Sequence, residues 1–154
     1  MEVISKHAEA FATLLSVAVA LILAWFGFRE NQRRERMEYT VSVLLERFRN
    51  EHVRTARRIL YERLDNDLPV RREDFTEPQF HDVMNLLAFY EFIAISTYQR
   101  RLDLPTIRRL SGNSIKRGYN GCREMVRERR ESFGRPGMFR ELERFVDQKL
   151  KNVE

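Results

Sequence analysis

The chain has 154 residues, which suits one small domain plus an appendage. Its formal net charge is +5, from 28 Lys and Arg residues against 23 Asp and Glu residues. The single cysteine, Cys122, excludes an intrachain disulfide and a cysteine-rich metal site.

An apolar stretch near the N-terminus comes first. Residues 10–28 carry no charged side chain, and as a helix these 19 residues rise about 28 Å, close to the thickness of a bilayer's hydrocarbon core. A buried core helix would be shorter and would keep a polar face. A signal peptide would need a basic n-region, which "MEVISKHAE" lacks. We therefore expect one transmembrane helix over 10–28, preceded by a short extracytoplasmic N-terminus over 1–9.

Aromatic and basic residues follow this stretch and indicate its orientation. Trp25 fits an aromatic belt at one membrane interface, and four arginines come directly after it: Arg29, Arg33, Arg34 and Arg36. Positive charges mark the cytoplasmic end of a membrane helix. We expect the N-terminus outside, residues 29–154 in the cytoplasm, and the lipid bilayer as a partner.

Small residues recur every four positions around the apolar stretch: Ala8, Ala12, Ser16, Ala20 and Ala24. This spacing lets two helices approach closely in lipid, so the stripe is a candidate interface for self-association. An alanine-rich helix also shows such a stripe by chance. Both interpretations stay open.

An amphipathic helix is predicted over 29–50, continuous with the transmembrane helix because no Pro or Gly interrupts it. Its apolar residues lie three or four positions apart: Met37, Val41, Leu44, Leu45 and Phe48. Asn50 fits the N-cap of a second helix. That helix carries apolar residues on one side: Val53, Ala56, Ile59, Leu60 and Leu64.

A third helix is the most apolar segment after the transmembrane helix and should be the centre of a bundle. Thr76 and Gln79 have the spacing of a capping box, and Pro78 fits the first turn. The predicted buried face comprises Val83, Leu86, Leu87, Tyr90, Ile93, Ala94 and Thr97. The predicted opposite face comprises His81, Asn85, Ser96 and Gln99, with Phe92 among them.

Further helices complete the chain. Asp103 predicts the start of a short helix that ends near Gly112. Asn113 or Ser114 then caps a longer helix, and Pro136 opens the last one. No segment alternates at period two for long enough to predict a strand. We therefore predict an all-α fold, with a single N-terminal transmembrane helix followed by a small cytoplasmic helical bundle over 51–154.

Two glycines lie inside the longer helix. Gly118 and Gly121 each weaken a helix by about 1 kcal/mol relative to alanine. We expect either close helix packing or a bend at these positions.

The order of these segments resembles the domain-of-unknown-function family 4760. The resemblance covers roughly residues 30–150 and follows "RNEHVRTARRILYERL", "NLLAFYEFIAI" and "RPGMFRELERF". The family consists of bacterial proteins, often with one or two N-terminal spans before a small helical domain. The resemblance implies a membrane-tethered helical module in the bacterial inner membrane. It implies no known activity and no functional residues.

Candidate catalytic and metal-binding residues are few. His7, His52 and His81 lack the further ligands that a metal site needs, so we predict no metal or cofactor. Glu91 interrupts the apolar run of the third helix. It is either a buried carboxylate in a perturbed environment or, as we favour, a boundary residue paired with an arginine. Cys122 fits a packed thiol better than a nucleophile.

Six pairs of adjacent arginines punctuate the chain. A possible anion-binding surface comprises Arg108, Arg109, Lys116, Arg117, Arg123 and Arg127. Such a surface would bind nucleic acid, a nucleotide phosphate or anionic lipid head groups. The alternative that we favour is a solvated face balanced by glutamates at helical spacing.

These patterns predict a protein that acts by binding and is not an enzyme. We expect the helical domain to serve as a tether, scaffold or regulator for a protein partner or for its own oligomer. The alternative is a membrane-tethered sensor of nucleic acid or nucleotides, in a stress or phage-defence setting. It depends only on the arginine pairs, and nucleic acid is not the favoured partner.

Overall fold

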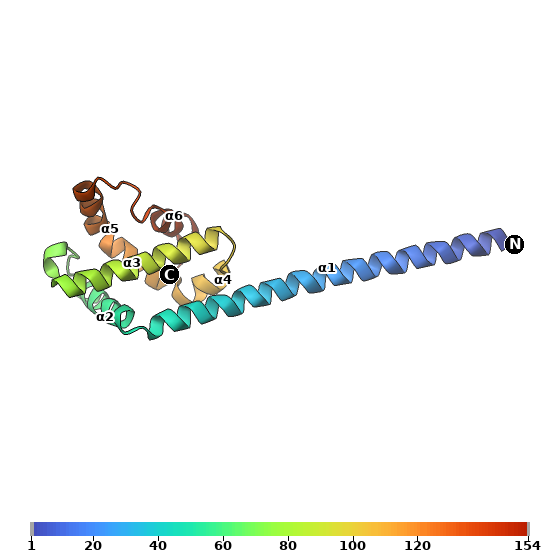
Figure 1. The fold of residues 1–154 in the computed structure, drawn as a ribbon, viewed down its shortest axis with the longest axis horizontal. Coiled ribbons are helices and arrows are strands. Elements are labelled where there is room, and N and C mark those ends of the chain that lie inside the picture. The colour runs from blue at the N-terminus through green and yellow to red at the C-terminus, as the bar shows by residue number, and fades with distance from the viewer. Residues whose placement is uncertain (1, 154) are drawn as a thin grey trace. The chain divides into compact units, whose positions relative to one another are not determined.

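The computed structural model describes the backbone of residues 2–153 and the side chains of residues 14–153. Within these limits the chain is helical and holds no strand, so the all-α prediction is confirmed. The helices are α1 (Glu2–Arg49), α2 (Glu51–Asp65), α3 (Glu77–Tyr98), α4 (Leu104–Ile107), α5 (Asn113–Phe133) and α6 (Arg140–Lys149), as Figure 1 shows. A 3₁₀ turn, η1 (Arg72–Asp74), precedes α3, and a π-helical segment, η2 (Arg108–Gly112), joins α4 to α5. Two compact units result, Met1–Arg36 and Met37–Glu154, and the second is called the bundle below.

α1 is one helix that includes both the apolar stretch and the amphipathic segment after it, as the sequence predicts. It ends at Arg49, where Asn50 starts α2. The Asn50 side-chain oxygen accepts hydrogen bonds from the backbone N–H groups of His52 (3.0 Å) and Val53 (3.3 Å). The predicted N-cap is therefore present, and it satisfies two donors that a helix start leaves open.

The last turns of α1 belong to the bundle and bury a narrower face than the sequence predicts. Leu44 is buried, but Met37 and Leu45 are 39% and 53% exposed. Two residues of the predicted apolar face therefore lie outside the face that α1 buries. Thr40, a polar residue outside that prediction, is fully buried. Its hydroxyl accepts a hydrogen bond from the backbone N–H of Asp103 (2.8 Å), and this bond compensates the burial of a polar group.

α3 is the central helix of the bundle and packs against α2, α5 and α6 (Figure 1). The predicted face of α3 is buried except at Thr97, which is half-buried. Ser96 was expected on the opposite face and is only 5% exposed, so that assignment is wrong. The chain folds back directly after α3, where the backbone N–H groups of Arg101 and Leu102 donate to the Ser96 carbonyl at 2.9 and 3.3 Å. The Ser96 carbonyl is thus part of a turn, which the helical periodicity of α3 does not predict.

The predicted break near Gly112 does not occur. Gly112 and Asn113 both have right-handed helical dihedrals, so the chain passes from α4 through η2 into α5 without a loop. Asn113 therefore caps nothing, and the prediction of a new helix start there is wrong. Asp103 does start α4 as predicted, because its carboxylate accepts from the backbone N–H of Thr106 at 3.0 Å. α5 ends at Gly134, whose φ of +58° is the left-handed conformation that glycine favours at a helix C-terminus.

The last helix starts four residues later than predicted. Pro136 lies in a series of turns, and α6 begins at Arg140. The Glu91 carboxylate of α3 accepts hydrogen bonds from the backbone N–H groups of Glu141 (3.3 Å) and Leu142. A contact from another helix therefore fixes the start of α6, where the sequence suggested a local proline signal.

Gly118 and Gly121 serve close helix packing. A Cβ on Gly118 would lie 3.2 Å from the Tyr61 hydroxyl oxygen and 3.3 Å from Tyr90 Cε2. A Cβ on Gly121 would lie 2.5 Å from Leu64 Cδ2, closer than van der Waals contact allows. The glycines let α5 approach α2 and α3, and this closeness offsets their poor helix propensity.

Candidate functional site

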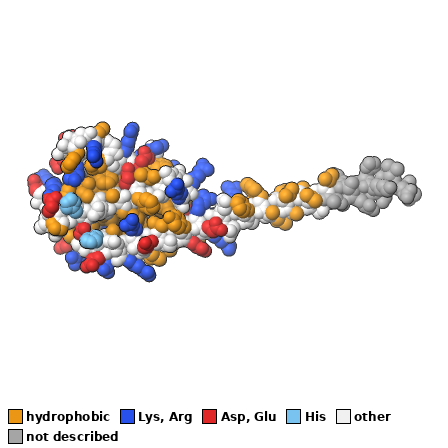
Figure 2. Space-filling view, in the orientation of Figure 1, with side chains coloured by type: hydrophobic (Ala, Val, Ile, Leu, Met, Phe, Trp, Pro, Cys, Tyr) orange, Lys and Arg blue, Asp and Glu red, His pale blue; other side chains and the backbone are white. Residues whose placement is uncertain are grey.

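The apolar segment of α1 exposes its side chains to the surroundings. All residues from Leu14 to Phe28 are exposed, for example Leu21 at 66% and Trp25 at 55%, and hydrophobic side chains cover this surface in Figure 2. No residue in the most apolar part of this helix is buried among the described side chains. A core helix is therefore excluded, because a core helix would be covered by its neighbours. α1 is long and apolar enough to cross a membrane, and so it is a candidate membrane-spanning helix near the N-terminus.

The residues expected at the membrane interface extend from the surface of α1. The Arg29 guanidinium carbon lies 5.3 Å from the centre of the Trp25 ring, a cation–π distance. Arg34 pairs with Glu30 at 3.7 Å, and Arg36 Nε donates to the Gln32 carbonyl at 3.3 Å. Together with the exposed Arg33, these side chains form a belt of cations next to the apolar segment.

The small-residue stripe lies partly outside the part of the chain whose side chains are described. This holds for Ala8 and Ala12. Ser16, Ala20 and Ala24 are exposed on α1. Self-association through this stripe stays a prediction.

Two of the predicted anion-binding residues contact the C-terminal end of the chain. Arg108 Nε donates to the Lys149 carbonyl at 2.9 Å. Lys116 Nζ donates to the carbonyls of Lys151 (3.1 Å) and Val153 (2.7 Å). Helix C-termini leave carbonyl groups unsatisfied and carry partial negative charge, so Arg108 stabilises the end of α6 and Lys116 holds the residues that follow it.

Three others form ion pairs. Arg117 pairs with Asp65 at 2.6 Å, Arg123 pairs with Asp147 at 2.8 Å, and Arg127 pairs with Glu124. The hydrogen bond to Asp147 raises the pKa of the Arg123 guanidinium above its usual value. Arg109 is exposed. Most cations of this predicted surface therefore already bind a carboxylate or a backbone carbonyl of the same chain.

Glu91 and Cys122, the two candidate catalytic residues, both have roles in the packing of the bundle. Burial raises the pKa of the Glu91 carboxyl, and its two backbone hydrogen bonds oppose that shift. Its hydrogen-bond partners are backbone N–H groups, and the expected arginine ion pair is absent among the described side chains. Cys122 is fully buried, and burial raises the pKa of its thiol to about 12. A thiol in this state holds its proton at neutral pH, which disfavours nucleophilic chemistry.

The two described histidines each contact one carboxylate. His52 Nδ1 lies 3.1 Å from Asp82 Oδ1, and His81 Nε2 lies 3.2 Å from Glu77 Oε1. Across residues 14–153, no three His, Cys, Asp or Glu side chains gather as metal ligands would.

Comparison with known families gives a result over most of the chain. Residues 14–148 match the family described as "Domain of unknown function (DUF4760)". The chain belongs to this family. No curated protein and no solved structure matches it. The resemblance found in the sequence is thus confirmed, and the match includes the apolar segment from Leu14 as well as the bundle.

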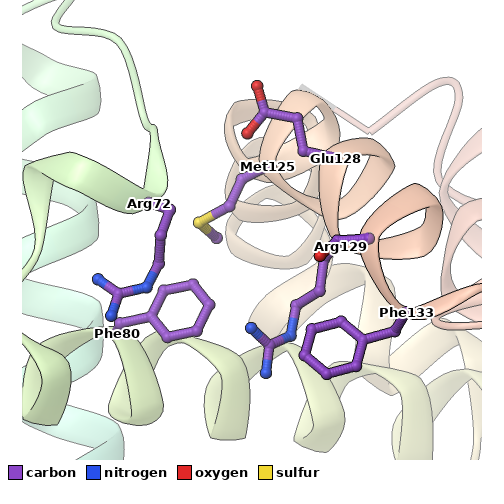
Figure 3. A pocket seen from close by; sticks show the side chains of 7 residues that line it. Arg72, Phe80, Met125, Glu128, Arg129 and Phe133 are labelled. Carbon is purple, nitrogen blue, oxygen red and sulfur yellow. The ribbon is translucent and has the colours of Figure 1, made fainter.

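One surface pocket of this DUF4760 protein combines aromatic rings with arginines. It lies between η1, the first turns of α3 and the end of α5, and has a volume of about 180 Å³. The guanidinium carbons of Arg72 and Arg129 lie 4.3 and 4.8 Å from the centre of the Phe80 ring, and Arg129 also lies 4.6 Å from Phe133. Figure 3 shows both guanidinium groups beside the aromatic rings, with the Glu128 carboxylate pointing away from them.

The sequence patterns do not predict this pocket. Arg71–Arg72 and Arg129–Arg130 are two of the six pairs of adjacent arginines, and the members of each pair have different surroundings. Arg71 pairs with Glu73 at 3.5 Å, whereas Arg72 stacks on Phe80. Arg130 pairs with Glu143 at 2.9 Å, whereas Arg129 stacks on aromatic rings. The spacing of Arg129 and Phe133 on one helix could have indicated their contact. Nothing local indicates the contact of Arg129 with Phe80.

Proposed function

We propose that this DUF4760 protein is a non-catalytic tether that holds a helical bundle at the bacterial inner membrane. In this proposal α1 crosses the membrane once, with the N-terminus outside and the bundle in the cytoplasm. The bundle binds a protein partner or a second copy of the chain. The observation that carries the proposal is that one helix, α1, includes both a fully exposed apolar segment and the buried Leu44.

The orientation is supported by charge. The belt of Arg29, Arg33, Arg34 and Arg36 follows the apolar segment directly, and cytoplasmic loops carry such an excess of cations. Among residues 1–9, on the other side of the segment, Lys6 is the one Lys or Arg. The asymmetry favours a cytoplasmic bundle.

A binding role is supported by the surface of the bundle. Phe92 and Ile95 are 47% and 37% exposed on the outer face of α3, and hydrophobic side chains appear over this helix in Figure 2. The pocket of Arg72, Phe80 and Arg129 offers the aromatic and arginine side chains that are enriched at protein interfaces. A non-catalytic role is supported by Glu91 and Cys122, since the first caps α6 and the second is buried.

The alternative function, sensing of nucleic acid or nucleotides through the predicted basic surface, has less support. Five of its six cations contact carboxylates or carbonyls in this structure. A bound nucleic acid would have to replace these contacts with contacts to its phosphates. Its affinity would then fall steeply with salt.

Membrane topology can be tested with fusions to the C-terminus. A green fluorescent protein fused there should fluoresce, and alkaline phosphatase fused there should be inactive, because the bundle would be cytoplasmic. The matched fusions at the N-terminus should give the opposite pair of results. An active C-terminal phosphatase would contradict the orientation.

The tethering role can be tested by purifying the tagged full-length protein from native membranes in mild detergent. We expect either a stoichiometric protein partner or a defined homo-oligomer, identified by mass spectrometry and light scattering. Disulfide crosslinking of Ser16→Cys in membranes tests pairing through the small-residue stripe. A monomer without any partner, and without a crosslink, would contradict the proposal.

A further inference from the structure

A second cavity lies between α2 and the first turns of α5 and has a volume of about 270 Å³. That volume is several times the roughly 30 Å³ that one water molecule occupies in the liquid. The residues that line it are polar or charged, apart from one aromatic ring: Arg57, Tyr61, Asp65, Asn113, Ser114 and Arg117. We call it the α2–α5 cavity.

Arg57 is an unusual cation within this cavity. Its Nε is buried and has no hydrogen-bond partner, and no carboxylate among the described residues pairs with its guanidinium. The guanidinium carbon lies 4.5 Å from the centre of the Phe48 ring and 5.9 Å from that of Tyr61. The two rings hold the group in place. Because this Nε is buried, a ligand in the cavity would meet the terminal N–H groups of the guanidinium.

A second guanidinium, that of Arg117 on α5, lines the same cavity. The Arg117 guanidinium carbon lies 6.0 Å from the centre of the same Tyr61 ring. Arg117 pairs with Asp65 through one nitrogen, which leaves its other N–H donors for a ligand. The Asn113 side chain, on the same turn of α5, adds an amide to the lining.

The donors and charges select the ligand chemistry. Two cations and one carboxylate leave the lining with one excess positive charge. The Tyr61 hydroxyl is already engaged, because it donates to the Ser114 carbonyl at 2.6 Å, so the charged donors of the lining are the two guanidinium groups. Planar guanidinium groups match the oxygens of phosphate in pairs, and a tetrahedral phosphate can present different oxygens to two helices.

We propose that the α2–α5 cavity is a binding site for a phosphate group, held by Arg57 and Arg117. Asp65 competes with the phosphate for Arg117 and thereby sets the affinity. The phosphate belongs either to a soluble molecule or to a lipid head group. The site differs from the basic surface predicted from the sequence, because Arg57 lies outside that set and five of that set's six residues lie outside the cavity.

The test is calorimetric titration of inorganic phosphate into the full-length protein in neutral detergent, against sodium chloride of equal ionic strength. We expect Arg57→Met to weaken phosphate binding by about tenfold or more, since it removes a charge-assisted contact. Asp65→Asn should strengthen binding, because it frees Arg117. Arg58→Met is the matched control: Arg58 follows Arg57 on α2, is exposed and does not line the cavity.

The outcomes separate the site from general charge effects. Equal weakening by Arg57→Met and Arg58→Met, or no preference for phosphate over chloride, would overturn the proposal. If Arg57→Met lowers the helix content measured by circular dichroism, Asp65→Asn and Arg117→Met carry the test in its place. These two must shift the affinity in opposite directions.

A second arm identifies the source of the phosphate. The same titration is repeated in nanodiscs of digalactosyldiacylglycerol, a lipid without phosphate, that contain either phosphatidylglycerol or the phosphate-free anionic lipid sulfoquinovosyldiacylglycerol. Weaker phosphate binding with phosphatidylglycerol than with the sulfolipid would support a lipid head group, because only the phospholipid would occupy the site. Equal binding in both nanodiscs would support a soluble phosphate compound. Binding in neither would overturn the proposal.

Discussion

Leucines in the apolar segment of α1 and leucines in the bundle have opposite surroundings. Leu21 and Leu23 are each 66% exposed, whereas Leu60 and Leu142 are completely buried. All four lie in helices. The difference comes from how the apolar residues are distributed around each helix.

The apolar segment of α1 is hydrophobic around its whole circumference, and its described residues, Leu14 to Phe28, are all exposed. α2, α5 and α6 instead alternate apolar and charged residues with helical periodicity, and each buries one stripe. A helix with one apolar stripe is stable in water once that stripe is packed. A helix that is apolar all round needs hydrocarbon as its surroundings. The same side-chain chemistry thus builds a protein core in one region and a candidate membrane anchor in the other.

The largest expected difference between the two regions comes from truncating one phenylalanine in each. Phe145 is fully buried, and its ring meets that of Tyr98 edge to face at 6.0 Å. Phe145→Ala should lower the free energy of unfolding of the bundle by about 3–5 kcal/mol, through lost burial and a new cavity. Phe26, which is 58% exposed on α1, is the matched position. Phe26→Ala should leave the unfolding of the bundle almost unchanged.

Urea unfolding of the full-length protein in detergent, followed by circular dichroism, measures both variants. Similar losses for Phe145→Ala and Phe26→Ala would mean that the apolar segment packs in the core in solution. The contrast between the two regions would then be wrong.

The next largest effect comes from adding a charge to each region. Leu21→Arg places a cation near the middle of the apolar segment, which costs about 3 kcal/mol for insertion into a membrane. We expect much of this variant to leave the membrane fraction after a carbonate wash. Leu68, 48% exposed in the loop after α2, provides the control, and Leu68→Arg should remain in the membrane. Equal retention of both variants would contradict a membrane-spanning α1.

The elements predicted correctly have signals within a few residues of sequence. Asn50 caps α2 through the backbone N–H groups two and three residues later. Gln79 accepts from the Thr76 backbone N–H at 3.0 Å, as the capping-box spacing indicates. The all-round apolar character of residues 10–28 and the periodicity of α3 are equally local. Local spacing was therefore sufficient for the fold class and for most helix starts.

The features that sequence analysis missed depend on residues far apart in the chain. Glu91 caps α6 across 50 residues, and this contact, not Pro136, fixes the start of that helix. Ser96 is buried where the chain folds back after α3, and no local pattern indicates that path. Arg57 and Arg117 meet at Tyr61 only because Gly118 and Gly121 let α5 approach α2. Side-chain sites of this kind follow from tertiary packing, which one sequence does not reveal.

A smaller effect is expected from adding a methyl group to one glycine in each region. A Cβ on Gly118 would meet the Tyr61 hydroxyl oxygen and the Tyr90 ring, and the hydroxyl oxygens of these two tyrosines are 3.3 Å apart. Overpacking costs about 1–3 kcal/mol, and the better helix propensity of alanine returns about 1 kcal/mol. Gly118→Ala should therefore destabilise the bundle by about 1 kcal/mol. Gly27 has nothing within 4 Å of such a Cβ, so Gly27→Ala should leave the thermal midpoint of the bundle unchanged.

Thermal unfolding of both glycine variants in the same detergent measures this difference. A midpoint for Gly118→Ala at or above that of the unmodified protein would show that Tyr61 and Tyr90 yield to the added methyl group. α5 would then be less closely packed than the distances indicate.

The smallest expected effect is a change in pH dependence on neutralising Glu91. Burial raises the pKa of this carboxyl in the folded protein, so the folded state holds its proton more tightly than the unfolded state does. The contribution of Glu91 to stability is therefore greatest below the ordinary carboxyl pKa of 4.5 and is lost as pH rises through the raised value. Glu91→Gln removes this dependence. The midpoint of the unmodified protein relative to Glu91→Gln should fall as pH rises through that window.

Glu38→Gln, at an exposed position of α1, controls for the removal of one negative charge. The change with pH of the midpoint relative to Glu91→Gln shows whether burial or hydrogen bonding dominates at the Glu91 carboxyl. A relative midpoint that falls with pH means that burial of the charge outweighs the hydrogen bonds from Glu141 and Leu142. A relative midpoint that rises with pH means that those two N–H groups stabilise the carboxylate more than burial opposes it, and the pKa is then lowered. The second result would contradict the raised pKa and make the charged form of Glu91 the stronger cap of α6.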